Sequence, residues 1–181
     1  MTNTFQPAKP PLPTEFRKPL IQGLSLPDEF YWVLPDPALL AGMQLPGLDT
    51  PWMSLHSQGF RWVACLCSDR PIYDPSPLEF LVTLELSDLF EASVPDDPEM
   101  EEKAIHLIAS AVVSKLENME GVIVHCAGGR GRTGTVIGAV LKKLGYRTSE
   151  IITFLDNVHL ARNKPGWPES PWQQEVIERT A

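Results

Sequence analysis

A glycine-rich segment placed directly after an apolar run constrains the fold of this chain more than any other feature. Residues 122–124 are Val-Ile-Val, which predicts a short buried strand. Three glycines follow within four positions and allow a tightly curled loop whose N–H groups turn inward. An apolar helix then runs to about Gly145. The pattern predicts a strand, an anion-binding loop and a helix in succession.

The residue types in the loop predict phosphate chemistry. Cys126 opens the loop, and Arg132 closes it with a planar guanidinium that can bind two phosphate oxygens. The positive end of the following helix favours an anion, so we expect Cys126 to attack as a thiolate. We expect His125 to orient the loop and Thr133 to donate a hydrogen bond to the sulfur. The positions expected to contact substrate are Ala127, Gly128, Gly129, Arg130, Gly131 and Arg132.

The rest of the chain alternates short apolar runs with amphipathic segments. The apolar runs predict four more strands, over residues 30–34, 39–43, 61–67 and 80–86. Further helices are predicted over residues 99–118, over residues 148–161 and from Ser170 onward. Strands that alternate with helices indicate an α/β fold with a mainly parallel sheet of about five strands.

Proline density sets the N-terminal segment apart. Dense proline favours extended chain and removes backbone donors. We therefore expect residues 1–25 to form a tail that is draped on the surface or disordered, and residues 26–181 to form one domain. The prolines of this segment are Pro7, Pro10, Pro11, Pro13 and Pro19.

Composition excludes several classes of protein. The net charge of −8 argues against a nucleic-acid surface. The chain has three cysteines, Cys65, Cys67 and Cys126, which are too few for a disulfide framework. No two of them have Cys-x-x-Cys spacing, so no metal is expected. The sequence has neither an apolar run long enough to span a membrane nor a signal-peptide pattern, so a cytoplasmic location is expected. The oligomeric state stays open.

The loop resembles the HCxxGxxR[ST]G signature of the protein-tyrosine-phosphatase superfamily, in the style of the small atypical dual-specificity phosphatases. Residues 30–42 and 59–66 also resemble the first strands of these enzymes, and the resemblance covers about residues 28–180. It implies a twisted sheet flanked by helices, a phosphocysteine intermediate and no cofactor. The implied substrates are phosphotyrosine or phosphoserine/threonine proteins. Phosphoinositides or other small phosphates are the alternative substrates. A non-catalytic phosphate-binding module is a third possible function, which the intact Cys126, Arg132 and Thr133 disfavour.

The resemblance also implies a general acid, an Asp on a loop before the signature. Asp88 follows the strand predicted over residues 80–86, at the edge where the loop should lie. Asp96 and Asp97 immediately precede a helix, where they would also serve as N-terminal caps. We favour Asp88 and keep Asp96 and Asp97 as alternatives.

Two further residues have two interpretations each. The resemblance implies that Gln173 lies near the site, but its spacing from Ser170 also fits a capping box. Arg130 either adds to the positive field of the loop or extends into solvent. The sequence leaves both choices open.

Overall fold

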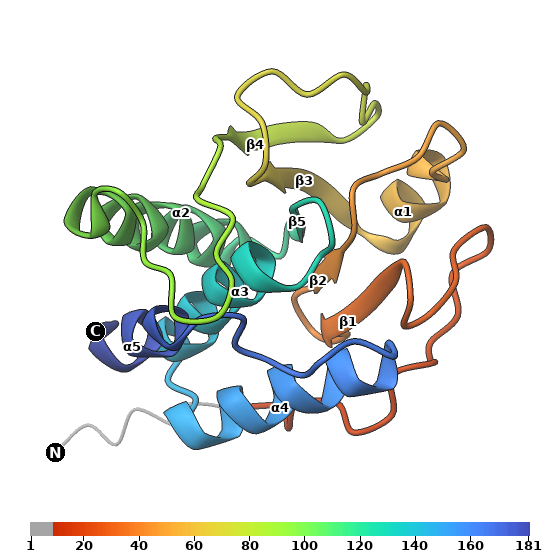
Figure 1. Ribbon diagram of the computed structural model, residues 1–181. Coiled ribbons are helices and arrows are strands. Elements are labelled where there is room, and N and C mark those ends of the chain that lie inside the picture. The colour runs from red at the N-terminus through yellow and green to blue at the C-terminus, as the bar shows by residue number, and fades with distance from the viewer. Residues whose placement is uncertain (1–8) are drawn as a thin grey trace, which may run out of the picture.

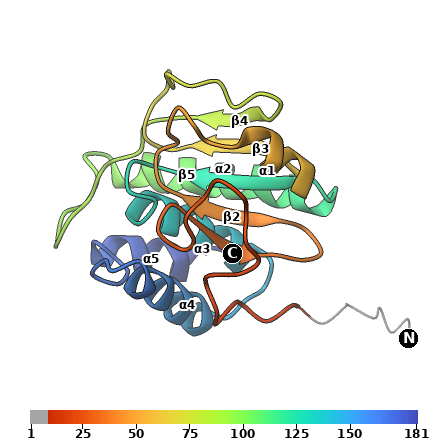
Figure 2. The ribbon, with the colours of Figure 1, turned by 90° about the vertical axis from the view of Figure 1, so that its right-hand side faces the viewer.

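The computed structural model describes residues 9–181 and contains one five-stranded sheet with helices on both faces (Figure 1). The strand order is β1-β2-β5-β3-β4, and Figure 2 shows β4, β3, β5 and β2 one below another. Only the β1–β2 pair is antiparallel, so the prediction of a mainly parallel sheet is confirmed. The strands are β1 Phe30–Leu34, β2 Leu40–Met43, β3 Phe60–Cys65, β4 Glu79–Thr83 and β5 Gly121–His125.

Helix α1 covers one face of the sheet, and the other four helices cover the opposite face (Figures 1 and 2). The sequence analysis did not predict α1, because Leu55 is its only fully buried residue and no periodic apolar pattern marks it. The strand expected to reach residue 67 ends at Cys65, because the chain bends at Leu66, and the strand expected to reach residue 86 ends at Thr83. The helices are α1 Trp52–Gln58, α2 Pro98–Glu117, α3 Gly131–Lys143, α4 Thr148–Ala161 and α5 Pro171–Arg179.

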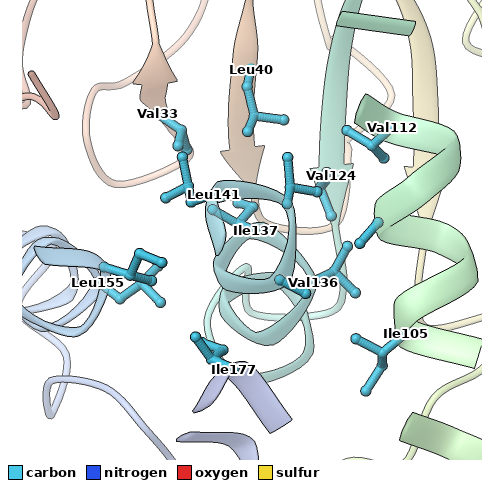
Figure 3. Packing of buried hydrophobic residues seen from close by; sticks show 14 of the residues in the cluster. Val33, Leu40, Ile105, Val112, Val124, Val136, Ile137, Leu141, Leu155 and Ile177 are labelled. Atoms are coloured by element: carbon cyan, nitrogen blue, oxygen red, sulfur yellow. The ribbon is translucent and has the colours of Figure 1, made fainter. Parts of the chain in front are cut away.

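Helix α3, which follows the glycine-rich loop, lies at the centre of the larger core (Figure 3). Its side chains Val136, Ile137 and Leu141 have no exposed surface. Full burial of one such side chain contributes about 1.5–3 kcal/mol to stability. The surrounding side chains shown in Figure 3 are Val33, Leu40 and Val124 from the sheet, Ile105 and Val112 from α2, Leu155 from α4 and Ile177 from α5. This packing fixes the first turn of α3, and with it the end of the loop.

The described part of the proline-rich segment lies against the domain. The hydroxyl of Tyr146 donates to the carbonyl of Pro10 at 2.7 Å, and the ring of Phe16 contacts that of Phe154 with centroids 6.1 Å apart. Residues 9–25 therefore follow the draped arrangement rather than the disordered one. Residues 1–8 lie outside the described residues, and the domain boundary at residue 26 stays a prediction.

Parallel pairing brings the carboxyl ends of four strands to one edge of the sheet. Cys65 at the end of β3 is paired with His125 at the end of β5, and Met43 at the end of β2 lies on the other side of His125. The loops that follow these strands therefore converge where the glycine-rich segment begins. None of the helices within residues 9–181 has the length and apolarity that a membrane span requires.

Candidate active site

The glycines of the loop serve different purposes. Gly129 has a φ of +68°, and a Cβ there would lie 2.5 Å from the carbonyl oxygen of Met43. At Gly131 the absence of a side chain leaves room for the carboxylate of Glu169, because a Cβ would overlap its Oε2. The nearest atom to a Cβ at Gly128 is 4.0 Å away. Gly129 is thus required by the backbone turn, whereas a side chain at Gly131 would require Glu169 to move.

Donors behind the loop bind its carbonyl oxygens. The buried guanidinium of Arg162 donates to Gly128 O and Gly129 O at 3.0 Å each. The hydroxyl of Tyr31 donates to Gly129 O at 2.9 Å, and Arg162 also donates to Asp28 O at 2.8 Å. With these carbonyls bound from behind, neighbouring N–H groups are left to face an anion. The sequence analysis missed Arg162 and Tyr31, because neither lies near the motif in the chain.

Unpaired donors mark the place of a ligand. Cys126 is 3% exposed and Arg132 8% exposed. Among residues 9–181, neither Nε of Arg132 nor Oγ1 of the buried Thr133 has a hydrogen-bond partner. A buried polar atom left unpaired costs about 1–3 kcal/mol, so such atoms require an explanation. A phosphoryl group bound in the loop would provide an acceptor for the Nε–H of Arg132.

Asp88 lies beside Arg132. Its Oδ1 is 3.5 Å from Nη2 of Arg132, whose Nη1 donates to Leu86 O at 3.3 Å. The loop that carries Asp88 is held by Ser87, whose N and Oγ donate to Glu101 at 2.9 and 2.6 Å. The Asp88 side chain is 75% exposed and lines a cleft of about 440 Å³ together with Arg132. Asp88 is therefore in reach of a substrate bound to Arg132.

Asp96 and Asp97 lie elsewhere. Asp97 is the N-cap of α2 and accepts a hydrogen bond from the N–H of Met100 at 3.1 Å. Asp96 is exposed beside it, and neither residue belongs to the lining of the cleft. The structure thus brings Asp88 to Arg132 and leaves the two alternatives at a helix start.

His125 is fully buried and bonded through both ring nitrogens. Nδ1 lies 3.2 Å from the carbonyl oxygen of Cys126, which can only accept, so Nδ1 carries the proton. Nε2 therefore accepts from the hydroxyl of Tyr73. Burial raises the pKa of Tyr73, so this hydroxyl stays protonated. The Tyr73 ring stacks on Trp52 with centroids 5.7 Å apart, which fixes the orientation of the histidine.

Arg130 does not extend into solvent, contrary to one interpretation from the sequence, and its contribution to the positive field of the loop stays a prediction. Its Nε donates to Gly166 O at 2.7 Å and its Nη1 to Glu169 at 3.0 Å. Burial raises the pKa of Glu169, and the charge of Arg130 opposes that shift. Arg130 therefore fastens the loop to the segment before α5, a role that no local sequence pattern indicates.

Gln173 is buried and closes the capping box that its spacing from Ser170 predicts, and its role at the site stays a prediction. Its Oε1 accepts from the N–H groups of Glu169 and Ser170 at 2.9 and 3.3 Å, which closes the capping box of α5. Its Nε2 also lies 3.0 Å from the point where a Cβ of Gly131 would stand. Gln173 therefore lies against the last part of the loop.

Comparison with known proteins identifies the family. The family model of PTP-SAK, described as "Swiss Army Knife protein, DSP-PTPase phosphatase domain", matches residues 27–164. The chain belongs to this family. The resemblance inferred from the signature is thereby confirmed, and the chain is a phosphatase domain of the dual-specificity type.

Solved structures share the fold of this PTP-SAK domain at low sequence identity. Tk-PTP in its active form is 21% identical with a TM-score of 0.58, over 85% of this chain and 96% of that chain. PTPMT1 in complex with PI(5)P is 18% identical with a TM-score of 0.60, over 82% and 93%. The core catalytic domain of the PP-IP phosphatase SIW14 from S. cerevisiae is 15% identical with a TM-score of 0.51, over 78% and 80%. These similarities confirm the predicted fold class.

Proposed function

We propose that this chain hydrolyses phosphate monoesters through a phosphocysteine intermediate on Cys126. The observation that carries the proposal is the placement of unpaired donors. Nε of Arg132 and Oγ1 of Thr133 are buried without a partner in the described chain, on the two residues that close the loop opened by Cys126. A phosphoryl group in the loop gives the arginine an acceptor, and a thiolate gives the hydroxyl one.

The reaction has two displacements. The Cys126 sulfur attacks phosphorus; an S–P bond forms while the bond from phosphorus to the leaving oxygen breaks. Asp88 gives its proton to that oxygen, then takes a proton from water, whose oxygen attacks phosphorus and releases the sulfur. Arg132 and the loop N–H groups stabilise the charge of the transferring group throughout. The hydroxyl of Thr133 donates to the departing thiolate, and His125 orients the loop.

The cleft in front of Arg132 favours an aryl phosphate. Leu45, Pro71 and Ile72 supply apolar surface to the lining. The cations Arg70 and Arg132 are matched there by two carboxylates, Glu85 and Asp88. A balanced, partly apolar cleft suits the ring of a phosphotyrosine in a protein better than several phosphate groups. We therefore infer phosphotyrosine proteins as the first substrate class, with phosphoserine and phosphothreonine sites as weaker ones.

Small polyphosphates are the second candidate, because Arg70 offers one cation beyond Arg132 at the cleft. Solved relatives include a protein crystallised with PI(5)P and a PP-IP phosphatase, which makes this class worth testing directly.

Substrate profiling tests the proposal. Phosphotyrosine peptides, phosphoserine peptides, phosphoinositides and inositol polyphosphates are compared at equal concentration by phosphate release. We expect the highest kcat/KM for phosphotyrosine peptides. In a matched control, Cys126→Ser should lower every rate by more than about a hundredfold, since covalent catalysis depends on the thiolate. Preference for an inositol polyphosphate would overturn the substrate assignment, and an active Cys126→Ser variant would overturn the mechanism.

A further inference from the structure

Two thiols and an imidazole gather beside the catalytic loop. Cys65 ends β3 and is paired in the sheet with His125 at the end of β5. The chain bends at Leu66, so Cys67 returns toward Cys65 and pairs with Glu85. One ligand atom from each of Cys65, Cys67 and His125 lies within 4.8 Å of the other two. Nothing in the catalytic cycle proposed above uses the two thiols.

We propose that Cys65, Cys67 and His125 form a binding site for a thiophilic divalent cation such as Zn²⁺. Thiolate and imidazole are the donors that Zn²⁺ takes in proteins, and three protein ligands leave a fourth position open. Zn–S bonds of about 2.3 Å in a tetrahedron would place the two sulfurs about 3.8 Å apart. Cys67 is only half-buried, so its side chain has the freedom to close the remaining distance.

The tautomer of His125 suits a cation. Because Nδ1 of His125 donates to the Cys126 carbonyl, the lone pair of the ring is on Nε2. A backbone carbonyl on the other ring nitrogen is the usual support of a metal-binding histidine. The cation would displace the Tyr73 hydroxyl from Nε2 and the protons of the two thiols.

The site opens into the catalytic cleft. Cys65, Cys67 and Tyr73 line the same cleft as Arg132 and Asp88, which gives an ion a route in and out. An ion there would detach His125 from Tyr73 and offer its open position to the Cys126 thiolate or to phosphate. Occupancy should therefore inhibit turnover reversibly. The inhibition rests on the proposed function, whereas the binding does not.

Binding is tested without catalysis in Cys126→Ser protein, which cannot bind metal through the nucleophile. Co²⁺ titration under a non-thiol reductant should produce thiolate-to-cobalt charge-transfer absorption that Zn²⁺ abolishes. Adding Cys67→Ser should weaken Co²⁺ binding at least about tenfold, the scale on which loss of metal-site groups acts. Absence of the absorption, or equal binding after Cys67→Ser, would overturn the site. Cys67 is chosen because it is less buried than Cys65 and its replacement disturbs the fold less.

Inhibition of turnover by Zn²⁺ is the second test. Zn²⁺ should inhibit wild-type turnover of an aryl phosphate, and Cys67→Ser should raise the inhibitory concentration at least about tenfold, each protein being compared with its own rate without Zn²⁺. Equal inhibition of both proteins would place the ion on Cys126 and contradict the proposal. If Co²⁺ binds in a Cys67-dependent way but the wild type has no turnover, the proposed function fails while the metal site stands.

Discussion

Arg162→Met tests whether the catalytic loop is held from behind. The native guanidinium donates to Gly128 O, Gly129 O and Asp28 O, and its Nη1 lies 3.1 Å from Nδ1 of His159. Methionine fills similar space but donates nothing. Gly129 O would keep the hydroxyl of Tyr31, whereas Gly128 O and Asp28 O would lose the side-chain donor that binds them.

The expected cost follows from these two carbonyls. Gly128 is half-buried and Asp28 is exposed, so water can partly replace the lost donor, and Arg162→Met should lower the free energy of unfolding by about 1.5–3 kcal/mol, the net value of hydrogen bonds to a charged group. Tyr31→Phe is the matched control, because Gly129 O then retains Arg162 and only one of two donors is lost. That variant should cost about 0.5–1.5 kcal/mol.

Urea unfolding of the three proteins measures these differences, and phosphate inhibition of each enzyme reports on the loop. We expect weaker phosphate binding in Arg162→Met than in Tyr31→Phe. If Arg162→Met is too unstable to purify, Tyr31→Phe still reports on the loop. A Tyr31→Phe protein with the free energy of unfolding and the phosphate affinity of the wild type would refute the argument. So would an Arg162→Met protein within about 0.5 kcal/mol of the wild type, the range of an ordinary surface substitution.

Three further predictions follow from the site. Asp88→Asn should slow hydrolysis of an alkyl phosphate by about 10²–10⁴-fold and hydrolysis of an activated aryl phosphate much less. Asp96→Asn and Asp97→Asn are matched controls. A loss of activity confined to either control would contradict the assignment of Asp88. Arg132→Lys should lower kcat/KM severely, because an ammonium cannot bind two oxygens in a fork; near wild-type kinetics would refute the geometry. Burial lowers the pKa of His159 to about 2, so the imidazole stays neutral in the folded protein. In the unfolded chain the same imidazole takes up a proton near pH 6.5. The free energy of unfolding therefore falls as the pH is lowered below about 6.5. Between pH 7 and pH 5 His159 should account for about 2 kcal/mol of lost unfolding free energy, and a His159→Gln variant with the same pH slope as the wild type would refute this.

The sequence predicts the parts of this molecule whose causes are local. The strand, loop and helix around Cys126 follow from adjacent residues, and α3 is buried as its apolar composition indicates. Helix α1 was missed because it is short and buries only Leu55 fully. Its position depends on tertiary contacts such as the stacking of Trp52 on Tyr73, which no periodicity reveals.

The supporting residues of the site were harder to predict than the reacting ones. Arg162 is the C-cap of α4 and Tyr31 lies in β1, so they meet the loop only after the sheet and helices assemble. The pairing of Arg130 with Glu169 is likewise a contact between distant segments. Asp88 was favoured because it follows a predicted strand whose carboxyl end lies at the same edge of the sheet as the catalytic loop. Its assignment as the general acid stays a prediction.

Trapping of the phosphoenzyme tests the central claim most directly. The enzyme is mixed with an aryl phosphate, quenched in acid within milliseconds and digested for mass spectrometry. We predict one phosphoryl group on the peptide that contains Cys126, attached through sulfur and absent from Cys126→Ser protein. Turnover with no phosphoryl group on Cys126 at any quench time, or with the label on another residue, would contradict the mechanism.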